Sequence, residues 1–345
     1  MDSLSQVVLG AAVGELVWGR KMGNRAQLLG AIGGTLPDLD ILFNYWWTDP
    51  IEQLHIHRGY SHSVFVHLLV AIPYGWITWK WMKDRISFRE SWLVWFLFFF
   101  THALLDCCTT YGTQLLLPFS DYLVGFNNIA VVDPFWTLPF MLSLLVCLFL
   151  RRNRPGRIRW AYAGVAYASA YMALTLVNKA VVHSHFAEEL GKRGIVYTRL
   201  STSPTMFNNI LWNGIALTPD SIYLGEYSLL QDDPAVQFVS YSRGEHLLAP
   251  YMGTSQVETL TWFSQGFHFT RAEGDTLQFF LAKWGRMDFT EAEAEKAFVF
   301  HWELVKNGGA IQEAIQVQPG LTREEFNRAI REFVRRIRGE ESSDG

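Results

Sequence analysis

Long apolar runs fill the first 182 residues of this chain and constrain its fold more than any other feature. A helix needs about 20 mostly apolar residues to cross the hydrocarbon core of a bilayer. Three runs reach this length, at Val64–Met82, Trp92–Leu117 and Trp160–Val182. Because backbone polar groups in lipid must be satisfied within the segment itself, these runs predict membrane-spanning helices.

Three further runs are shorter or less apolar. Phe135–Leu150 is somewhat short, while Leu4–Trp18 and Ala26–Trp46 are rich in Gly and Ala. Small residues let helices approach each other closely in a bilayer, so we expect the last two to be inner helices packed against protein. The sequence therefore predicts an α-helical polytopic membrane domain over residues 1–182, with about six transmembrane helices.

The basic residues between these runs indicate the topology. The odd-numbered connections carry 12 Lys and Arg residues, whereas the even-numbered ones carry only Arg58. Since Lys and Arg are enriched in cytoplasmic loops, we expect the odd-numbered connections to be cytoplasmic. The N-terminus, the even-numbered connections and residues 183–345 are then expected to lie outside the cytoplasm.

The C-terminal part has the mixed signals of a soluble α+β domain. Ser221–Leu230 and Thr276–Phe289 resemble β-strands, and Leu321–Ile337 resembles a helix with Thr322 and Glu325 at capping-box spacing. This part carries no catalytic motif, so we expect it to shape access to a site or to recruit a partner. The sequence has no basic block of the kind that is typical of nucleic-acid binding, so nucleic acid is not an expected partner.

Ionisable residues occur at four places in or beside the apolar runs, all near the outer ends of the predicted helices. A charged side chain at the centre of a bilayer costs roughly 2.5–3.5 kcal/mol on insertion scales, so each is expected to have a partner or a function. Their common depth predicts that they converge on one site. The four places are Asp2, Asp38 with Asp40, the segment His55–His62, and His102 with Asp106.

The residue types and spacing are typical of metal ligands. His102 and Asp106 are four residues apart, so they share one helix face and can ligate one metal ion or bracket two. Imidazole and carboxylate together suit zinc, manganese or iron better than calcium. We therefore predict one or two divalent ions, with zinc preferred over manganese and iron. The predicted ligands are Asp2, Asp38, His57, His62, His102 and Asp106.

These residues also have structural interpretations. A lone His at a helix end is usually an ordinary hydrogen-bonded residue, and a His and an Asp four apart can simply hold helices together. Asp2 can be a helix cap, and Arg58 can pair with Asp38 or Asp40. Convergence of all of them at one depth favours the metal site.

Several motifs together resemble a known family. They are Met1-Asp2-Ser-Leu-Ser-Gln, Gly34-Thr-Leu-Pro-Asp-Leu-Asp40, His57-Arg-Gly-Tyr-Ser-His-Ser63, and Thr101-His-Ala-Leu-Leu-Asp106 followed by Thr110-Tyr-Gly-Thr-Gln114. They resemble the bacterial inner-membrane proteins called YdjM/YfhP-type metal-dependent hydrolases. The resemblance covers the membrane half, and residues 183–345 look like the extra domain of longer, YfhP-like members.

The resemblance implies a multi-pass protein of the bacterial inner membrane and metal-dependent hydrolysis. Many relatives have a His at the position of Gln6, and since Gln is a poor metal ligand, this departure puts a second metal in doubt. The family is distantly similar to zinc-dependent phospholipases C and to S1/P1-type nucleases, which use His and Asp to hold a zinc cluster that cleaves phosphodiesters. Such a likeness of fold does not by itself transfer an activity.

We therefore expect a membrane-bound metal-dependent hydrolase, phosphodiesterase-like or phospholipase-like, that cleaves a phosphoester of a lipid or lipid-linked substrate at the outer face of the membrane. A bound metal makes hydroxide available at neutral pH. Asp40 is expected to support a ligand or to take a proton, and Arg58 to bind a phosphate oxygen.

Two other classes of function compete with this hypothesis. In the first, the protein is not catalytic, its metal pins helices together, and the outer domain binds a protein partner. An open coordination position distinguishes a catalytic site from such a closed structural one. The second class is a transporter, which predicts polar residues that continue to the cytoplasmic half. Glu15 is the one such residue that the membrane half offers, so transport is disfavoured.

Overall fold

The computed structural model describes residues 1–286, 298, 300–307, 310–317 and 323–340. The chain divides into two compact units, each described here by itself. A helical unit comprises Met1–Trp47, His55–Leu176 and Met206–Asn208, and a β-rich unit comprises Thr48–Leu54, Val177–Thr205 and Asn209–Gly345. The chain thus has a helical N-terminal region and a C-terminal β-sheet domain.

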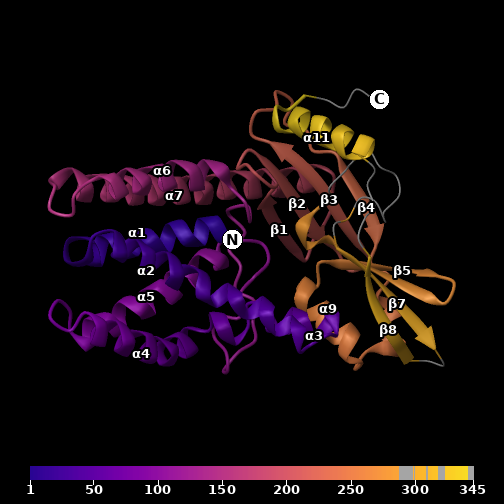
Figure 1. Ribbon diagram of the computed structural model, residues 1–345. Coiled ribbons are helices and arrows are strands. Elements are labelled where there is room, and N and C mark those ends of the chain that lie inside the picture. Colours follow the sequence, from indigo (N-terminus) through magenta and orange to yellow (C-terminus); the bar gives the residue numbers. More distant parts are fainter. Residues whose placement is uncertain (287–297, 299, 308–309, 318–322, 341–345) are drawn as a thin grey trace. The chain divides into compact units, whose positions relative to one another are not determined.

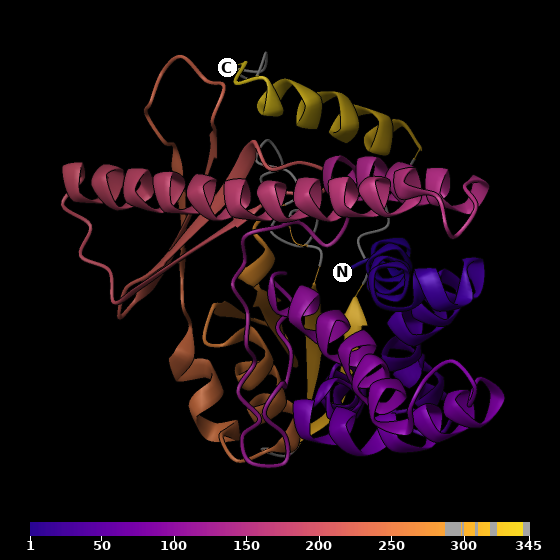
Figure 2. The same ribbon diagram turned by 90° about the vertical axis from the view of Figure 1, so that its left-hand side faces the viewer.

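The helical unit follows the predicted apolar runs. Figure 2 shows its last helix, α7, as one unbroken helix, whose residues from Val177 onward belong to the β-rich unit. The helices before it are connected by short turns, except for a long irregular segment between α5 and α6 (Figure 1). The elements are α1 (Ser3–Met22), α2 (Asn24–Thr35), η1 (Leu36–Tyr45), α3 (Pro50–Ile56), η2 (Tyr60–His62), α4 (Val64–Trp81), α5 (Phe88–Cys107), α6 (Pro134–Phe149) and α7 (Pro155–Lys192).

Helices α1 and α2 form an antiparallel hairpin held together by glycines. A Cβ atom added at Gly10 would lie 2.1 Å from the carbonyl oxygen of Gly30, and one at Gly14 would lie 2.1 Å from that of Ala26. No side chain fits between backbones this close. The prediction that these two weakly apolar runs pack closely against protein is therefore confirmed, and their packing fixes the Gly34 carbonyl near the site described below.

Two predicted helices end earlier than the apolar runs suggested. The run Ala26–Trp46 is not one α-helix, because α2 ends at Thr35 and a 3₁₀ helix with Pro37 in its first turn follows. Proline has no N–H to continue the α-helical hydrogen-bond ladder. The run Trp92–Leu117 is helical only to Cys107. Beyond it, Gly112 adopts φ +90°, a conformation that ends regular helix.

The helices of the helical unit differ in how well their length and apolar composition support a membrane span. Among the described helices, α7 meets a test of length and apolar composition for a membrane span, and α6 is a shorter apolar helix. The predicted count of about six spans is therefore not established by this criterion. Large apolar side chains are nonetheless exposed on α4, among them Leu69, Trp76 and Ile77. An exposed apolar helix surface is what a lipid-facing helix presents.

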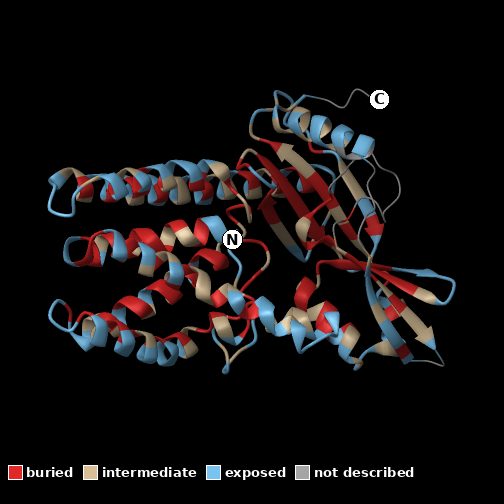
Figure 3. Cartoon of the chain, in the orientation of Figure 1, coloured by how far each residue is buried: buried red, intermediate tan, exposed pale blue. Residues whose placement is uncertain are grey.

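The β-rich unit contains two four-stranded antiparallel sheets with strand orders β1-β2-β3-β4 and β5-β6-β7-β8. The described residues of this unit also form the helices α8 (Glu245–Leu248), α9 (Ser255–Ser264) and α11 (Arg323–Ile337). Figure 3 shows buried residues along β2 and exposed residues over α11. The strands are β1 (Arg199–Pro204), β2 (Leu211–Leu217), β3 (Ser221–Ser228), β4 (Phe238–Ser242), β5 (His268–Glu273), β6 (Thr276–Leu281), β7 (His301–Asn307) and β8 (Ala310–Val317).

The predicted elements of this unit are largely found. Strand β3 confirms the first predicted strand and α11 the predicted helix, whereas its predicted cap, Thr322, lies outside the described residues. The second predicted strand ends earlier than expected within the described residues, because β6 ends at Leu281 and a short 3₁₀ turn, η4 (Ala282–Trp284), follows. Its last predicted residues, 287–289, lie outside the described residues. Both sheets contribute to one core, in which Tyr241 of β4 stacks on Phe269 of β5 at 4.5 Å between ring centroids.

Candidate metal centre

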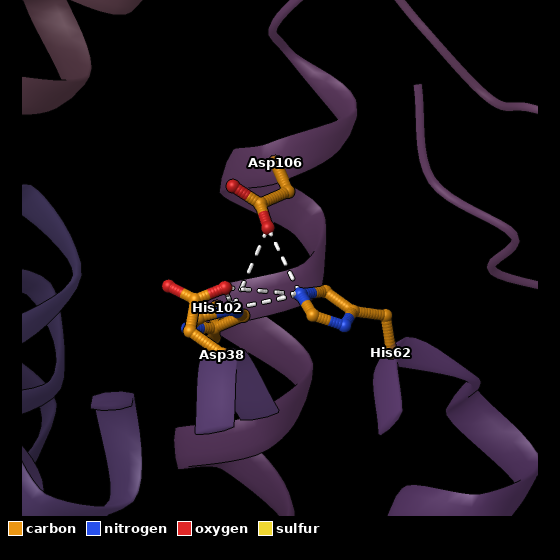
Figure 4. A group of neighbouring side chains, drawn as sticks. All are labelled: Asp38, His62, His102 and Asp106. Carbon is orange, nitrogen blue, oxygen red and sulfur yellow. Dashed lines mark hydrogen bonds and ion pairs between the residues drawn. The ribbon is translucent and has the colours of Figure 1, made fainter. Parts of the chain in front are cut away.

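Four predicted ligands converge inside the helical unit. Asp38, His62, His102 and Asp106 each offer one ligand atom, and these atoms lie within 4.8 Å of one another (Figure 4). Asp38 comes from η1, His62 from η2, and His102 and Asp106 from consecutive turns of α5. The structure thus brings together, from three segments, side chains that the sequence analysis predicted to lie at one depth in the membrane.

The four side chains present two imidazole nitrogens and two carboxylate oxygens to the same point. The Nε2 atoms of His62 and His102 are 3.0 Å apart. The Oδ2 atom of Asp106 lies 3.1 Å from His62 Nε2 and 3.4 Å from His102 Nε2. The Oδ1 atom of Asp38 lies 3.5 Å and 3.3 Å from the same two nitrogens. Two nitrogen and two oxygen donors are a set that suits zinc and other transition metals.

The outer nitrogens of both histidines are already engaged. His102 Nδ1 lies 2.6 Å from the carbonyl oxygen of Gly34, which can only accept, so Nδ1 carries the proton and Nε2 presents its lone pair to the cluster. His62 Nδ1 lies 2.9 Å from Ser61 Oγ and 3.6 Å from Asp40 Oδ2. Metal-bound histidines are usually held in this way, by a carbonyl or carboxylate on the far nitrogen. The residues therefore fit a divalent metal ion.

Asp106 divides its two oxygens between the cluster and the protein. Oδ2 faces the histidines, whereas Oδ1 accepts from Gln6 Nε2 at 3.0 Å and pairs with Arg58 NH2 at 3.3 Å. The amino group of Met1 also contacts Oδ1. These donors fix the carboxylate so that a single oxygen points at the cluster.

Gln6 stands beside the cluster and holds one of its members. Its Nε2 donates to Asp106 Oδ1 and, at 3.2 Å, to the carbonyl oxygen of His102. Its Oε1 is buried and has no hydrogen-bond partner in the described part of the chain. Gln6 therefore orients Asp106 through its amide nitrogen, where the resemblance led us to look for a histidine.

Arg58 is buried next to the cluster in an unusual backbone conformation. Its φ is 58°, in the left-handed region, where a residue other than glycine is strained by about 1–3 kcal/mol. NH1 donates to Thr109 Oγ1 at 3.0 Å, and the guanidinium lies 4.8 Å from the centre of the Tyr111 ring. Its side chain thus pairs with Asp106, whereas the sequence had offered Asp38 or Asp40 as structural partners.

Asp40 organises the turn that carries His62. Its carboxylate accepts from the backbone N–H of Arg58 at 2.9 Å and from Ser61 Oγ at 2.7 Å. The Nδ1 atom of His57 lies 3.0 Å from Asp40 Oδ1, and the His57 side chain is 28% exposed. His57 therefore faces Asp40 and is not among the four converging residues, so its role as a ligand stays a prediction.

Asp2 also lies outside the group of four. It caps α1 by accepting from the backbone N–H of Ser5 at 3.0 Å, which is the structural alternative named above. Its role as a ligand likewise stays a prediction. Residues that sequence reasoning missed are Ser61, Thr109 and the backbone of Gly34. A hydroxyl or a carbonyl group leaves no pattern in sequence that would mark it as a neighbour of a metal ligand.

A family model covers nearly all of the helical unit. Residues 1–182 match the model of the family described as YdjM inner membrane protein. The uncharacterized protein YfhP of Bacillus subtilis (strain 168) is 26% identical over 153 residues, which cover 42% of this chain and 46% of that protein. The match therefore spans about half the length of this curated relative. No solved structure matches the chain.

Proposed function

This chain belongs to the YdjM inner membrane protein family, and from that premise we propose that it is a multi-pass inner-membrane hydrolase. It binds a divalent metal ion, zinc in the first place, through Asp38, His62, His102 and Asp106. It cleaves a phosphoester of a lipid or lipid-linked substrate at the outer face of the membrane. The observation that carries the proposal is the convergence of two Nε2 atoms and two carboxylate oxygens within 4.8 Å.

The burial of the four residues indicates through which of them water or substrate can reach the site. The side chains of His62, His102 and Asp106 are at most 1% exposed, whereas that of Asp38 is 18% exposed. The cluster is thus closed on three members and partly open at the fourth. Catalytic zinc sites use three protein ligands and keep a position for water or substrate, whereas structural sites fill all four positions with protein donors. The proposed catalysis therefore requires that Asp38, the most exposed member, leaves its position to water or substrate, or that the metal takes a fifth ligand there.

An apolar cavity next to Asp38 supports a lipid substrate. Its volume is about 320 Å³. Two of its lining residues, Leu36 and Leu39, flank Asp38 on the same 3₁₀ helix. A hydrocarbon chain in this cavity would lie against the 3₁₀ helix that carries Asp38, the most exposed member of the cluster. The lining residues are Val7, Ala31, Ile32, Thr35, Leu36 and Leu39.

The residues around the cluster have distinct roles in the proposed reaction. A bound divalent metal supplies hydroxide at neutral pH. Arg58 holds a phosphate oxygen through its guanidinium, which stands beside Asp106. Asp40 keeps Arg58 and His62 in place through its hydrogen bonds to the Arg58 N–H and to Ser61 Oγ. Because Asp40 is not one of the four converging donors, we assign it the role of proton acceptor.

The role of Arg58 gives a direct test of hydrolysis. Protein purified in detergent is assayed on a generic soluble phosphodiester and on a panel of phospholipids. Metal is supplied in excess, because Arg58 also supports Asp106 and its loss is expected to weaken metal binding. Under these conditions Arg58→Ala should still take up metal and should lower kcat/KM by roughly 100-fold or more, the usual loss when one preorganised donor to a developing charge is removed. Arg58→Lys should recover part of the loss, because it keeps the charge without the planar fork.

Two outcomes of this assay would contradict the proposal. If the wild-type protein holds metal but hydrolyses nothing on the panel, the metal is structural and the non-catalytic alternative stands. If Arg58→Ala retains full activity, Arg58 is not the phosphate-binding residue.

The proposed topology is tested by reporter fusions. An alkaline phosphatase placed after Gly345 should be active, because the reporter folds only outside the cytoplasm, and one placed after Asn153 should be inactive. Asn153 is exposed in the α6–α7 connection, so an insertion there leaves neighbouring contacts in place. The opposite pattern of activities would overturn the orientation derived from the basic residues.

A further inference from the structure

A second, cationic cavity lies in the helical unit at the end of α1 remote from the metal cluster. Its volume is about 220 Å³. Arg20 is in the last turn of α1, and at 1.5 Å per residue it lies roughly 21 Å along that helix from Gln6. The α6–α7 connection supplies the rest of the wall. The lining residues are Arg20, Arg152, Asn153, Arg154 and Pro155, so three arginines and no acidic residue line it.

Neighbouring basic residues in the same unit already have partners. Lys21 pairs with Glu90 at 2.6 Å, Arg157 pairs with Glu15 at 2.6 Å, and Arg25 lies over the ring of Trp81. Each of these three basic side chains is therefore engaged by a carboxylate or an aromatic ring of the protein.

The three arginines of the cavity differ from these neighbours. Arg20, Arg152 and Arg154 are exposed, and within the described ranges no carboxylate lies within ion-pair distance of them. Arg152 has one hydrogen bond, at 3.3 Å to the carbonyl oxygen of Lys21, which leaves its remaining donors free for a ligand. Three positive charges held together without a counter-charge repel one another, so an anion in the cavity relieves an unfavourable arrangement.

We propose that this cavity binds the phosphate group of an anionic phospholipid. Guanidinium groups pair with phosphate oxygens through two parallel hydrogen bonds, and three of them can surround one phosphate. The cavity lies at the helix ends that the basic residues assign to the cytoplasmic side, where anionic lipids attract cationic pockets between helices. The proposal does not depend on hydrolysis at the metal cluster.

The test is a binding measurement on delipidated protein in a non-ionic detergent. Short-chain phosphatidylglycerol or phosphatidylcholine is titrated in, and the bound fraction is read by native mass spectrometry. The wild-type protein should prefer phosphatidylglycerol. The triple variant Arg20→Gln, Arg152→Gln and Arg154→Gln should bind it at least about 100-fold more weakly, since each guanidinium that pairs with the phosphate supplies charge-assisted hydrogen bonds whose loss costs roughly tenfold or more. Binding of phosphatidylcholine should not change.

The matched control removes the same number of charges elsewhere in the helical unit. Arg25→Gln, Arg89→Gln and Arg159→Gln, all at exposed positions, should weaken phosphatidylglycerol binding less than about threefold. An equal loss in both triple variants would overturn the proposal in favour of diffuse charge attraction. Inorganic phosphate that binds as tightly as phosphatidylglycerol would overturn the lipid assignment. An unchanged elution profile and metal content show that each variant is folded.

Discussion

Replacing His102 or Asp106 by alanine should remove the bound metal and any hydrolytic activity while the protein still inserts into the membrane. Each residue supplies one of four converging donors, and both approach the same nitrogen of His62. Disturbing even a residue that only supports a metal ligand typically weakens binding 10–100-fold, so loss of a ligand should weaken it by roughly 100-fold or more. Elemental analysis of the purified protein measures the metal content directly.

A conservative variant separates loss of metal from loss of fold. Asp106→Asn keeps the shape of the side chain and lets Oδ1 remain hydrogen-bonded to Gln6, but an amide is a weaker ligand than a carboxylate. It should lose metal while the elution profile stays that of the wild-type protein. Full metal content in all three variants would return His102 and Asp106 to the structural alternative, a buried pair that holds helices together.

The control for these metal-ligand variants is a histidine of the β-rich unit, replaced by alanine. The structure of that unit decides which histidine is suitable. His268 is unsuitable because it is 3% exposed, stacks on Phe279 and lies 2.8 Å from Ser264 Oγ through Nδ1. Burial lowers its pKa to about 4, so it is a neutral core residue whose loss would destabilise its domain. His246 is exposed on the short helix α8, and His246→Ala should leave metal content and stability unchanged.

The sequence predicted the site best where regular helix carries it. His102 and Asp106 are four residues apart in an α-helix, and this periodicity alone places them on one face. His57 and His62 lie in a turn where Arg58 adopts a positive φ, and no periodicity relates side-chain directions there. The sequence therefore predicted both histidines as ligands and did not reveal that His62, and not His57, is one of the four converging residues.

The same limit applies to the fold. Gly and Ala in the first two runs predicted close helix packing because the reason is local and steric. The end of α5 at Cys107 was missed because the apolar run continues to Leu117, while Thr109 turns its hydroxyl back to the carbonyl oxygen of Asp106 at 2.8 Å. The pairing of eight strands into two sheets depends on contacts between distant segments, which a single sequence does not reveal.

The second prediction with a large expected effect concerns protein stability. It rests on a buried ion pair between Glu15 of α1 and Arg157 of α7. Two parallel hydrogen bonds of 2.6 Å join the guanidinium to the carboxylate. Gln27 donates to Glu15 at 2.9 Å, and Arg157 also donates to Asn24 at 2.7 Å. The side chains are 1% and 3% exposed. Glu15, the polar residue that seemed isolated in the sequence, therefore joins α1, α2 and α7.

Glu15→Gln should lower the free energy of unfolding by about 3–5 kcal/mol, because it leaves the charge of Arg157 buried without a counter-charge. Arg157→Gln should have a similar effect for the opposite reason. The double variant Glu15→Met and Arg157→Met should be more stable than either single variant, since replacing a buried ion pair by apolar residues is often close to neutral. Unfolding of the purified protein by denaturant in detergent measures these differences.

The exposed pair between Lys21 and Glu90 in the same unit is the matched control. Its side chains are 42% and 27% exposed, so Lys21→Gln should cost only about 0–1 kcal/mol, as is usual for surface ion pairs. A loss below about 1 kcal/mol in Glu15→Gln would contradict the prediction, because a buried pair must then behave like an exposed one. A double variant no better than the single ones would show that these residues act through packing or hydrogen bonds to Gln27 and Asn24, since removing both charges would then bring no relief.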